Sequence, residues 1–150
     1  MRTILTAAFV LVAGLVLQVR ADGELVKFPE AFADGVLYAT VTRGTLKEEI
    51  FASRAAIEAV KAGQPIPSGT AITLVDYRDG KLFRYVVMEK RAGWGASYPP
   101  EKRNGEWEFQ AFNPDKTVNR NETLDRCFSC HKPKAAQDFV WTLDRMKASR

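Results

Sequence analysis

The sequence predicts a mainly β, α+β domain: an antiparallel sheet with one substantial helix and a short helical segment near the C-terminus. Stretches of high β-propensity with alternating apolar and polar residues recur along the chain. Two turn signals, Asp79-Gly80 and Asn104-Gly105, stand beside such stretches. The best-defined helical pattern is confined to residues 45–62. Strands that alternate with short turns favour an antiparallel sheet over a bundle of four helices.

The first strand and the helix are expected between residues 35 and 63. Residues 35–43 (GVLYATVTR) are rich in β-branched and aromatic side chains and predict a strand. Thr45 stands three residues before Glu48, which is the spacing of a capping box. Four apolar residues follow at helical spacing: Leu46, Ile50, Ile57 and Val60. Because Gly63 ends this pattern, we expect a helix over residues 45–62.

A hairpin and a further strand complete the expected sheet. Residues 70–77 and 82–90 both have high β-propensity and flank Asp79-Gly80, which predicts a β-hairpin. Residues 106–113 follow Asn104-Gly105 and predict another strand. Apolar residues alternate with polar ones in that strand: Trp107, Phe109 and Ala111.

The N-terminus has the pattern of an export signal. A basic start is followed by an apolar run over residues 4–19, and Val19-Arg20-Ala21 offers a cleavage site after Ala21. The run is shorter than the ~20 apolar residues of a spanning helix, so we favour a cleaved signal peptide over a membrane anchor. We therefore expect a signal peptide at 1–21 and a single domain at 22–150, exported to a bacterial periplasm and not held at the membrane.

The charge of the mature domain does not indicate a nucleic-acid partner. The expected signal peptide contains Arg2 and Arg20 and no acidic residue, so its removal lowers the formal net charge from +4 to +2. That value is small, and no basic run with interleaved aromatic residues accompanies it. We expect no nucleic-acid partner.

The sequence Cys127-Phe128-Ser129-Cys130-His131 contains both cysteines and the single histidine of the chain. C-x-x-C-H is the pattern by which a c-type haem is attached to a protein. In this interpretation Cys127 and Cys130 form thioethers with the haem vinyl groups, and His131 is the proximal ligand of the iron. The sequence predicts one covalently bound haem c.

Three other uses of these residues are weaker. A structural zinc site needs four ligands, and this segment supplies three. A thioredoxin-like C-x-x-C would follow a strand in a βαβ unit, whereas this one follows a polar stretch. A disulfide would suit an oxidising compartment but would not explain the adjacent histidine.

The C-terminal half, MEKRAGWGASYPPEKRNGEWEFQAF followed by CFSCHKPKAAQDFVWT, resembles the cytochrome P-460 family. The resemblance covers residues 30–145 and is closest to the branch without a lysine cross-link, cytochrome c′-β. It implies a mainly antiparallel β fold, a homodimer, and one c-type haem with a single histidine ligand. Cys127, Cys130 and His131 match the family's attachment and ligand positions. The ligands and substrates it implies are nitric oxide, carbon monoxide and hydroxylamine.

Two departures from the family pattern concern its enzymatic members. Those that oxidise hydroxylamine carry a lysine joined covalently to the haem, and Leu74 stands at that position in this chain. Arg84 stands where those members carry a pocket carboxylate. A guanidinium cannot accept a proton at neutral pH, but it can donate hydrogen bonds to a ligand that gains negative charge. Arg84 is therefore a candidate distal polar and catalytic residue. Its alternative is a surface position paired with Asp76 or Glu89.

Four further residues are candidates for the distal side. Phe32, Phe51 and Phe83 could cap the distal pocket together with Leu74, although core packing is the commoner role of phenylalanine. Met88 could be a sixth iron ligand, although methionine in a strand is usually a packing residue.

The residues leave three functions open. The favoured one is a protein that binds nitric oxide or carbon monoxide at a five-coordinate iron in nitrogen-oxide binding or detoxification. The second is a haem oxidoreductase that acts on hydroxylamine or peroxide. The third is an electron-transfer cytochrome c with a methionine as sixth ligand.

Overall fold

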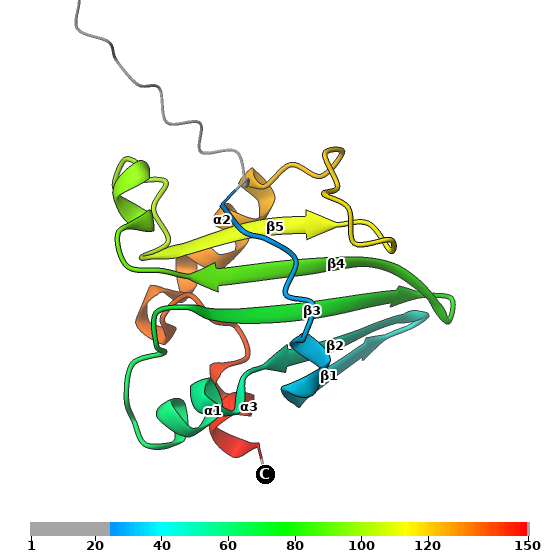
Figure 1. The fold of residues 1–150 in the computed structure, drawn as a ribbon, viewed down its shortest axis with the longest axis horizontal. Coiled ribbons are helices and arrows are strands. Elements are labelled where there is room, and N and C mark those ends of the chain that lie inside the picture. The colour runs from blue at the N-terminus through cyan, green and yellow to red at the C-terminus, as the bar shows by residue number, and fades with distance from the viewer. Residues whose placement is uncertain (1–24, 150) are drawn as a thin grey trace, which may run out of the picture.

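The computed structural model of the protein describes residues 25–149. The expected signal peptide, at 1–21, lies outside the described residues. The fold is a five-stranded sheet in the order β1-β2-β3-β4-β5, and every neighbouring pair is antiparallel. Figure 1 shows the strands side by side in chain order. Their bounds are Val36–Arg43 (β1), Leu46–Ala52 (β2), Thr70–Arg78 (β3), Lys81–Lys90 (β4) and Trp107–Phe112 (β5).

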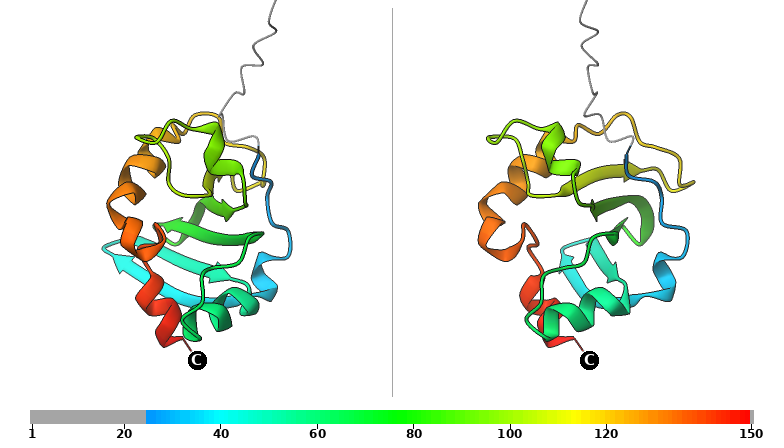
Figure 2. Two further views of the ribbon diagram at one scale, coloured as in Figure 1. Left: turned by 90° about the vertical axis from the view of Figure 1, so that its left-hand side faces the viewer. Right: turned by 60° about the vertical axis from the view of Figure 1, so that its left-hand side comes forward.

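Helices occupy the connections and the C-terminal part. The α-helices are α1 (Arg54–Lys61), α2 (Asp125–His131) and α3 (Leu143–Ala148). Three 3-10 helices accompany them: η1 (Phe32–Asp34), η2 (Trp94–Ser97) and η3 (Lys132–Gln137). Figure 2 shows α2, η3 and α3 along one face of the sheet, with the N-terminal segment along the other. Within residues 25–149, no helix is long and apolar enough to cross a membrane.

The predicted mainly β, α+β fold is confirmed, and so is the predicted hairpin. Asp79 and Gly80 join β3 to β4 with φ angles of 50° and 73°. Both lie in the left-handed region that a two-residue hairpin turn requires. The strands expected at 35–43 and 106–113 appear as β1 and β5.

The predicted helix at 45–62 is wrong in its first half. Leu46–Ala52 is strand β2, which pairs with β1 on one side and β3 on the other. Gly44, with φ 59°, makes the tight turn into β2. The helix α1 begins after Ser53, whose Oγ accepts a hydrogen bond from the Ala56 N–H at 3.2 Å. Apolar residues four apart, such as Leu46 and Ile50, fit a strand as well as a helix, so their spacing could not separate the two.

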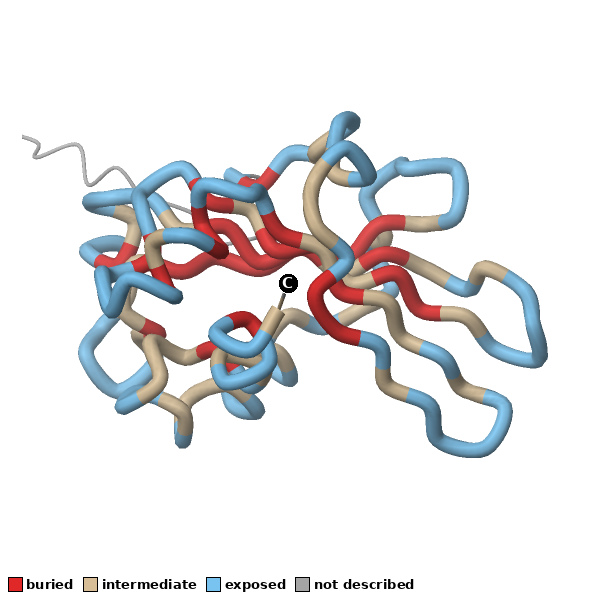
Figure 3. Tube along the Cα trace, turned by 90° about the horizontal axis from the view of Figure 1, so that it is seen from below, coloured by how far each residue is buried: buried red, intermediate tan, exposed pale blue. Residues whose placement is uncertain are grey.

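The two faces of the sheet carry different clusters. The inner face packs against α1, α3 and the C-terminal segment through a cluster that includes Ile50, Ile72, Met88, Phe109 and Met146. The outer face packs against the N-terminal segment through a second cluster: Val26, Val75, Tyr85, Val87 and Phe112, with Phe28, Phe32 and Phe51 beside them. Figure 3, coloured by burial, shows the buried residues gathered along the strands of the sheet.

Candidate haem site

A cavity of about 490 Å³ lies between the inner face of the sheet and the C-terminal segment. Its sheet wall comes from four strands: Ile50 of β2, Ile72 and Leu74 of β3, Val86 and Met88 of β4, and Phe109 of β5. Its opposite wall comes from α2 and the chain that follows: Cys127, Cys130, His131, Val140, Trp141 and Thr142. The three residues of the predicted haem motif therefore face one cavity with an apolar sheet wall.

Helix α2 brings the motif side chains to the same cavity. Cys127, Cys130 and His131 are three and four residues apart, and residues at these spacings share a face of an α-helix. The two cysteines are not joined in a disulfide, and Cys127 is partly buried whereas Cys130 is exposed. Burial raises the pKa of the Cys127 thiol, and the nearby Glu122 carboxylate raises it further.

The imidazole of His131 is oriented by one backbone group. Its Nδ1 lies 2.6 Å from the carbonyl oxygen of Phe139. A carbonyl can only accept, so Nδ1 carries the proton and donates, and Nε2 keeps a free electron pair. Burial lowers the pKa of His131, and the hydrogen bond to Phe139 partly opposes that effect. At neutral pH the ring is a neutral imidazole whose Nε2 can bind a metal.

Two hydrogen bonds hold the chain after His131 in place as a cavity wall. Trp141 Nε1 donates to the Cys130 carbonyl at 3.1 Å. The hydroxyls of Tyr38 and Thr142 are 2.7 Å apart, which connects strand β1 to this wall. Burial raises the pKa of Tyr38 to about 12, so this phenol keeps its proton throughout the physiological range.

Five charged residues also line the cavity and form its charged rim: Arg43, Glu48, Arg84, Glu122 and Arg126. The sheet register places Glu48 and Arg84 toward the end of the strands away from Phe109. Arg84 lines the cavity and is also paired with carboxylates. Its Nε donates to Asp76 Oδ2 at 3.1 Å, and its Nη1 donates to Glu122. Arg84 therefore pairs with Asp76, as the alternative interpretation of the sequence expected, and it also lines the cavity. Glu89 instead bonds Arg91 at 2.6 Å.

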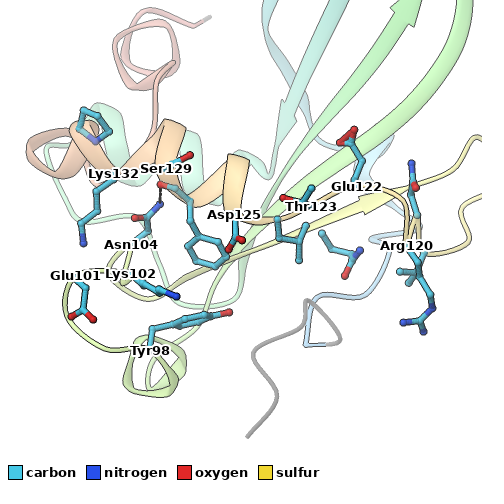
Figure 4. Close-up of a pocket in the computed structure, with 16 residues that line it drawn as sticks. Tyr98, Glu101, Lys102, Asn104, Arg120, Glu122, Thr123, Asp125, Ser129 and Lys132 are labelled. Atoms are coloured by element: carbon cyan, nitrogen blue, oxygen red, sulfur yellow. Dashed lines mark hydrogen bonds between the residues drawn. The ribbon is translucent and has the colours of Figure 1, made fainter.

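A larger hollow of about 880 Å³ lies on the other side of α2 (Figure 4). Its lining is mostly polar and charged, and includes Tyr98, Glu101, Lys102, Asp125 and Lys132. None of the motif side chains that could bind haem lines it. Although this hollow is larger than the cavity that the motif faces, its polar lining makes it the poorer candidate for binding an apolar macrocycle.

The family model for cytochrome P460 matches residues 29–142. The chain belongs to the cytochrome P460 family. No curated protein matches it significantly. Family membership makes it a haem-binding cytochrome, and the cavity beside α2 is where the motif side chains that could bind a haem come together in this P460 fold.

The residues of this P460 cavity fit a haem. Its volume lies within the roughly 300–1,000 Å³ range of small-molecule sites. The donor set comprises two thiols and one neutral imidazole with Nε2 free, and the wall opposite is apolar. Across residues 25–149, no three His, Cys, Asp or Glu side chains form a group that could hold a bare metal ion.

Leu74 lies on the sheet wall of the P460 cavity, between Ile50 and Val86 in register. No lysine is among the described residues that line this cavity. Lys81 begins β4 as an exposed residue, and Lys90 bonds Asp138. Neither Lys81 nor Lys90 therefore offers the cavity the amine that a lysine at position 74 would offer.

The three phenylalanines proposed for the distal pocket do not line the P460 cavity, which corrects that expectation. Phe32 and Phe51 pack together on the outer face, with ring centroids 5.2 Å apart. Phe51 follows Ile50 in the strand, and consecutive strand residues point to opposite faces. Phe83 is 44% exposed, and the guanidinium of Arg78 stacks 3.8 Å from its ring centroid.

Met88 does line the cavity, in register with Ile72 and Phe109. The Phe109 ring lies 4.9 Å from the His131 ring. Met88 therefore belongs to the row of the sheet nearest to the histidine. Leu74 and Val86 belong to the next row toward the charged rim.

Sequence reasoning missed the Phe139 carbonyl and the rim residues Arg43, Glu122 and Arg126. A backbone carbonyl carries no residue-type signal, so only the fold shows that Phe139 faces His131. The rim residues come from β1, α2 and the chain before α2, and only the tertiary fold brings these segments to one cavity.

Proposed function

We propose that this cytochrome is a periplasmic c-type cytochrome that binds nitric oxide or carbon monoxide at a five-coordinate haem iron. Its role would be the binding or detoxification of nitrogen oxides. The observation that carries the proposal is the arrangement of His131 across a cavity from an apolar wall with leucine at position 74.

The motif residues have separate tasks in this proposal. Cys127 and Cys130 would hold the haem through thioethers: each S–H would add across one vinyl group, with sulfur bonding to one vinyl carbon and hydrogen to the other. His131 supplies Nε2 as the axial ligand, because its Nδ1 is already committed to Phe139. When bound, the haem supplies an iron that can take a diatomic ligand at its sixth position.

The apolar wall would select uncharged ligands. Ile50, Leu74 and Val86 offer no hydrogen-bond donor or acceptor from their side chains. An anion or a bound water would lose hydration at this wall without a compensating partner, whereas nitric oxide and carbon monoxide lose little. The side chains therefore favour small neutral ligands over charged ones.

Three parts of the proposal rest on the sequence. The expected signal peptide at 1–21 supports the periplasm, and the family resemblance supports a homodimer and covalent attachment of one haem. Light scattering of the purified protein would test the dimer. Mass spectrometry of the mature chain would test both the cleavage after Ala21 and the mass of one attached haem.

An oxidoreductase is the second candidate, and the position of Arg84 favours it. This guanidinium lies in the cavity with a buried carboxylate behind it, so it could polarise an O–O or N–O bond. Steady-state turnover of peroxide or hydroxylamine that exceeds free haem and falls in Arg84→Lys would support it. Leu74 cannot form the covalent bond to haem that the lysine of the cross-linked enzymes forms, which argues against that form of the activity.

An electron carrier is the third candidate, because Met88 lines the cavity and has a thioether that can bind iron. Met146 does not compete, since it is fully buried in the core cluster and outside the cavity lining. A Met88→Leu variant with an unchanged spectrum in both redox states would exclude methionine ligation.

Titration of the reduced protein with nitric oxide and carbon monoxide tests the main proposal. We expect saturable binding of one ligand per chain, with an affinity that changes less than about threefold in Met88→Leu. His131→Gly should alter the spectrum of the free and the ligand-bound protein. Failure of both gases to bind the reduced protein would contradict the proposal.

A further inference from the structure

The carboxylate of Asp138 joins the connection between η3 and α3 to the sheet. Lys90 Nζ donates to its Oδ2 at 2.6 Å, and Trp107 Nε1 approaches its Oδ1 at 3.3 Å. Trp107 is 1% exposed, so one of the two partners belongs to the core. Lys90 ends β4 and Trp107 begins β5, and the two residues are paired in register. Asp138 is thus held by two neighbouring positions of the sheet.

The turn that Asp138 begins has an unusual backbone. Asp138 and Phe139 have φ angles of 50° and 61°, both in the left-handed region that residues with a Cβ rarely adopt. Two hydrogen bonds support this turn: Asp138 N–H to the Ala135 carbonyl at 3.1 Å, and Phe139 N–H to the Lys134 carbonyl at 2.8 Å. The Phe139 ring lies against Gly105, where a Cβ would be 3.0 Å from the ring. A strained turn of this kind persists only where its surroundings determine it.

This turn presents the carbonyl that orients His131. The Phe139 oxygen accepts the hydrogen bond from His131 Nδ1 at 2.6 Å. Asp138 is the residue immediately before it, so a shift at Asp138 moves the acceptor. A continuous series of contacts therefore runs from the sheet through Asp138 and the Phe139 carbonyl to the imidazole.

We propose that Asp138 is a positioning residue that sets the strength of the His131 hydrogen bond and, through it, the donor strength of Nε2 toward iron. This inference rests on the proposed ligation by His131. A well-aligned acceptor at Nδ1 increases the basicity of the imidazole, and a more basic proximal ligand stabilises ferric iron. Asp138 thereby lowers the reduction potential without contacting the haem ligand itself.

The test compares ferrous holoprotein variants by resonance Raman spectroscopy and by redox titration. Asp138→Gly keeps a residue that accepts the left-handed backbone but removes both side-chain contacts. We expect its iron–histidine stretching band to move to lower frequency and its reduction potential to rise. Asp138→Asn keeps an acceptor for Trp107 Nε1 and should give smaller shifts in the same directions.

Two further variants separate positioning from folding. Lys90→Met removes the same ion pair from the strand side and should shift both measurements in the direction of Asp138→Gly. Lys116→Gln is the matched control, since it removes a Lys–carboxylate pair of the same 2.6 Å length, to Glu30, at a distant site. It should leave both measurements unchanged.

The outcomes distinguish this inference from the proposed function. An iron–histidine band that Asp138→Gly and Lys90→Met both leave in place, with an unchanged potential, would overturn the role of Asp138 alone. An iron–histidine band that survives His131→Gly would overturn the ligation by His131 and this inference with it.

Discussion

Arg84 donates a hydrogen bond from Nε to Oδ2 of Asp76 at 3.1 Å, and this pair connects the charged rim of the cavity to a fully buried carboxylate. Asp76 also accepts from Arg78 at 3.3 Å, while its Oδ1 has no hydrogen-bond partner. The pair places a guanidinium at the cavity and restricts its movement. It makes Arg84 a structural residue as well as a candidate distal residue.

Replacing Asp76 should therefore destabilise the fold. Asp76→Ala leaves two arginines without a shared acceptor, and we expect a loss of about 3 kcal/mol in the free energy of unfolding. Urea denaturation of the purified protein measures it. Asp144→Ala is the matched control, because its pair with Lys147 is exposed, and it should cost less than about 0.5 kcal/mol. Equal losses in the two variants would show that Asp76 contributes no more than a surface pair.

Ionisation of the Glu108 carboxyl should lower the free energy of unfolding as the pH rises. Its side chain is buried, and burial raises its pKa from 4.5 to about 7, although the hydrogen bond from Tyr98 lowers it. Between about pH 4.5 and 7 the folded state thus holds a proton on Glu108 that the unfolded state releases. The contribution of this protonated carboxyl to the free energy of unfolding is complete below about pH 4.5 and is lost as the pH rises to about 7. The loss is on the order of 3 kcal/mol.

Denaturation at several pH values tests this contribution. Glu108→Gln cannot ionise, so its stability should decrease less than that of the wild type between pH 4.5 and 7. Tyr98→Phe removes a donor to the charged carboxylate, so the transition should move to higher pH. Parallel curves for the wild type and Glu108→Gln would contradict the assignment.

Much of the fold could be predicted from residue patterns. The hairpin of β3 and β4 followed from Asp79-Gly80 between two β-rich segments, and the short helical segment expected near the C-terminus includes α2, which carries C-x-x-C-H. The strand at 46–52 could not be separated from a helix because its apolar residues are spaced by four. What decides for a strand is its pairing with β1 on one side and, on the other, with β3, which helix α1 separates from it in the sequence.

The opposite wall of the cavity was harder to predict than the motif. Leu74 came from the family pattern and does line the cavity, whereas Phe51 was proposed as an aromatic residue that could cap the distal face in the way aromatic residues do in cytochrome c′-β. Its neighbour Ile50 faces the cavity, so Phe51 points to the outer face. The alternation within a strand could have separated these two residues, but only after the segment was known to be a strand. No sequence feature marks the Phe139 carbonyl.

A lysine at position 74 should bring an amine to the cavity. Leu74→Lys replaces a wall residue opposite His131, and we expect the ferric protein to gain a low-spin component, because an uncharged amine can bind iron. Electron paramagnetic resonance measures the spin state. Leu37→Lys is the control, since Leu37 is 46% exposed on β1 and does not line the cavity. A spectrum of Leu74→Lys that matches this control would show that position 74 does not face the iron.

Covalent attachment predicts graded effects of the two cysteines. Cys127→Ser and Cys130→Ser should each shift the α-band of the pyridine haemochrome to that of a haem with one free vinyl group. The double variant should lose its haem to acid acetone. Ser129→Ala, at an exposed position between the cysteines, should retain the wild-type band. Extraction of haem from the wild type by acid acetone would contradict thioether attachment.

The coordination number of the ferrous iron tests the proposed function most directly. Magnetic circular dichroism of the reduced wild-type protein at neutral pH measures it without added ligand. His131 as single axial ligand facing an apolar wall predicts a five-coordinate, high-spin ferrous spectrum that changes fully when carbon monoxide is added. A six-coordinate, low-spin spectrum in both redox states would contradict it.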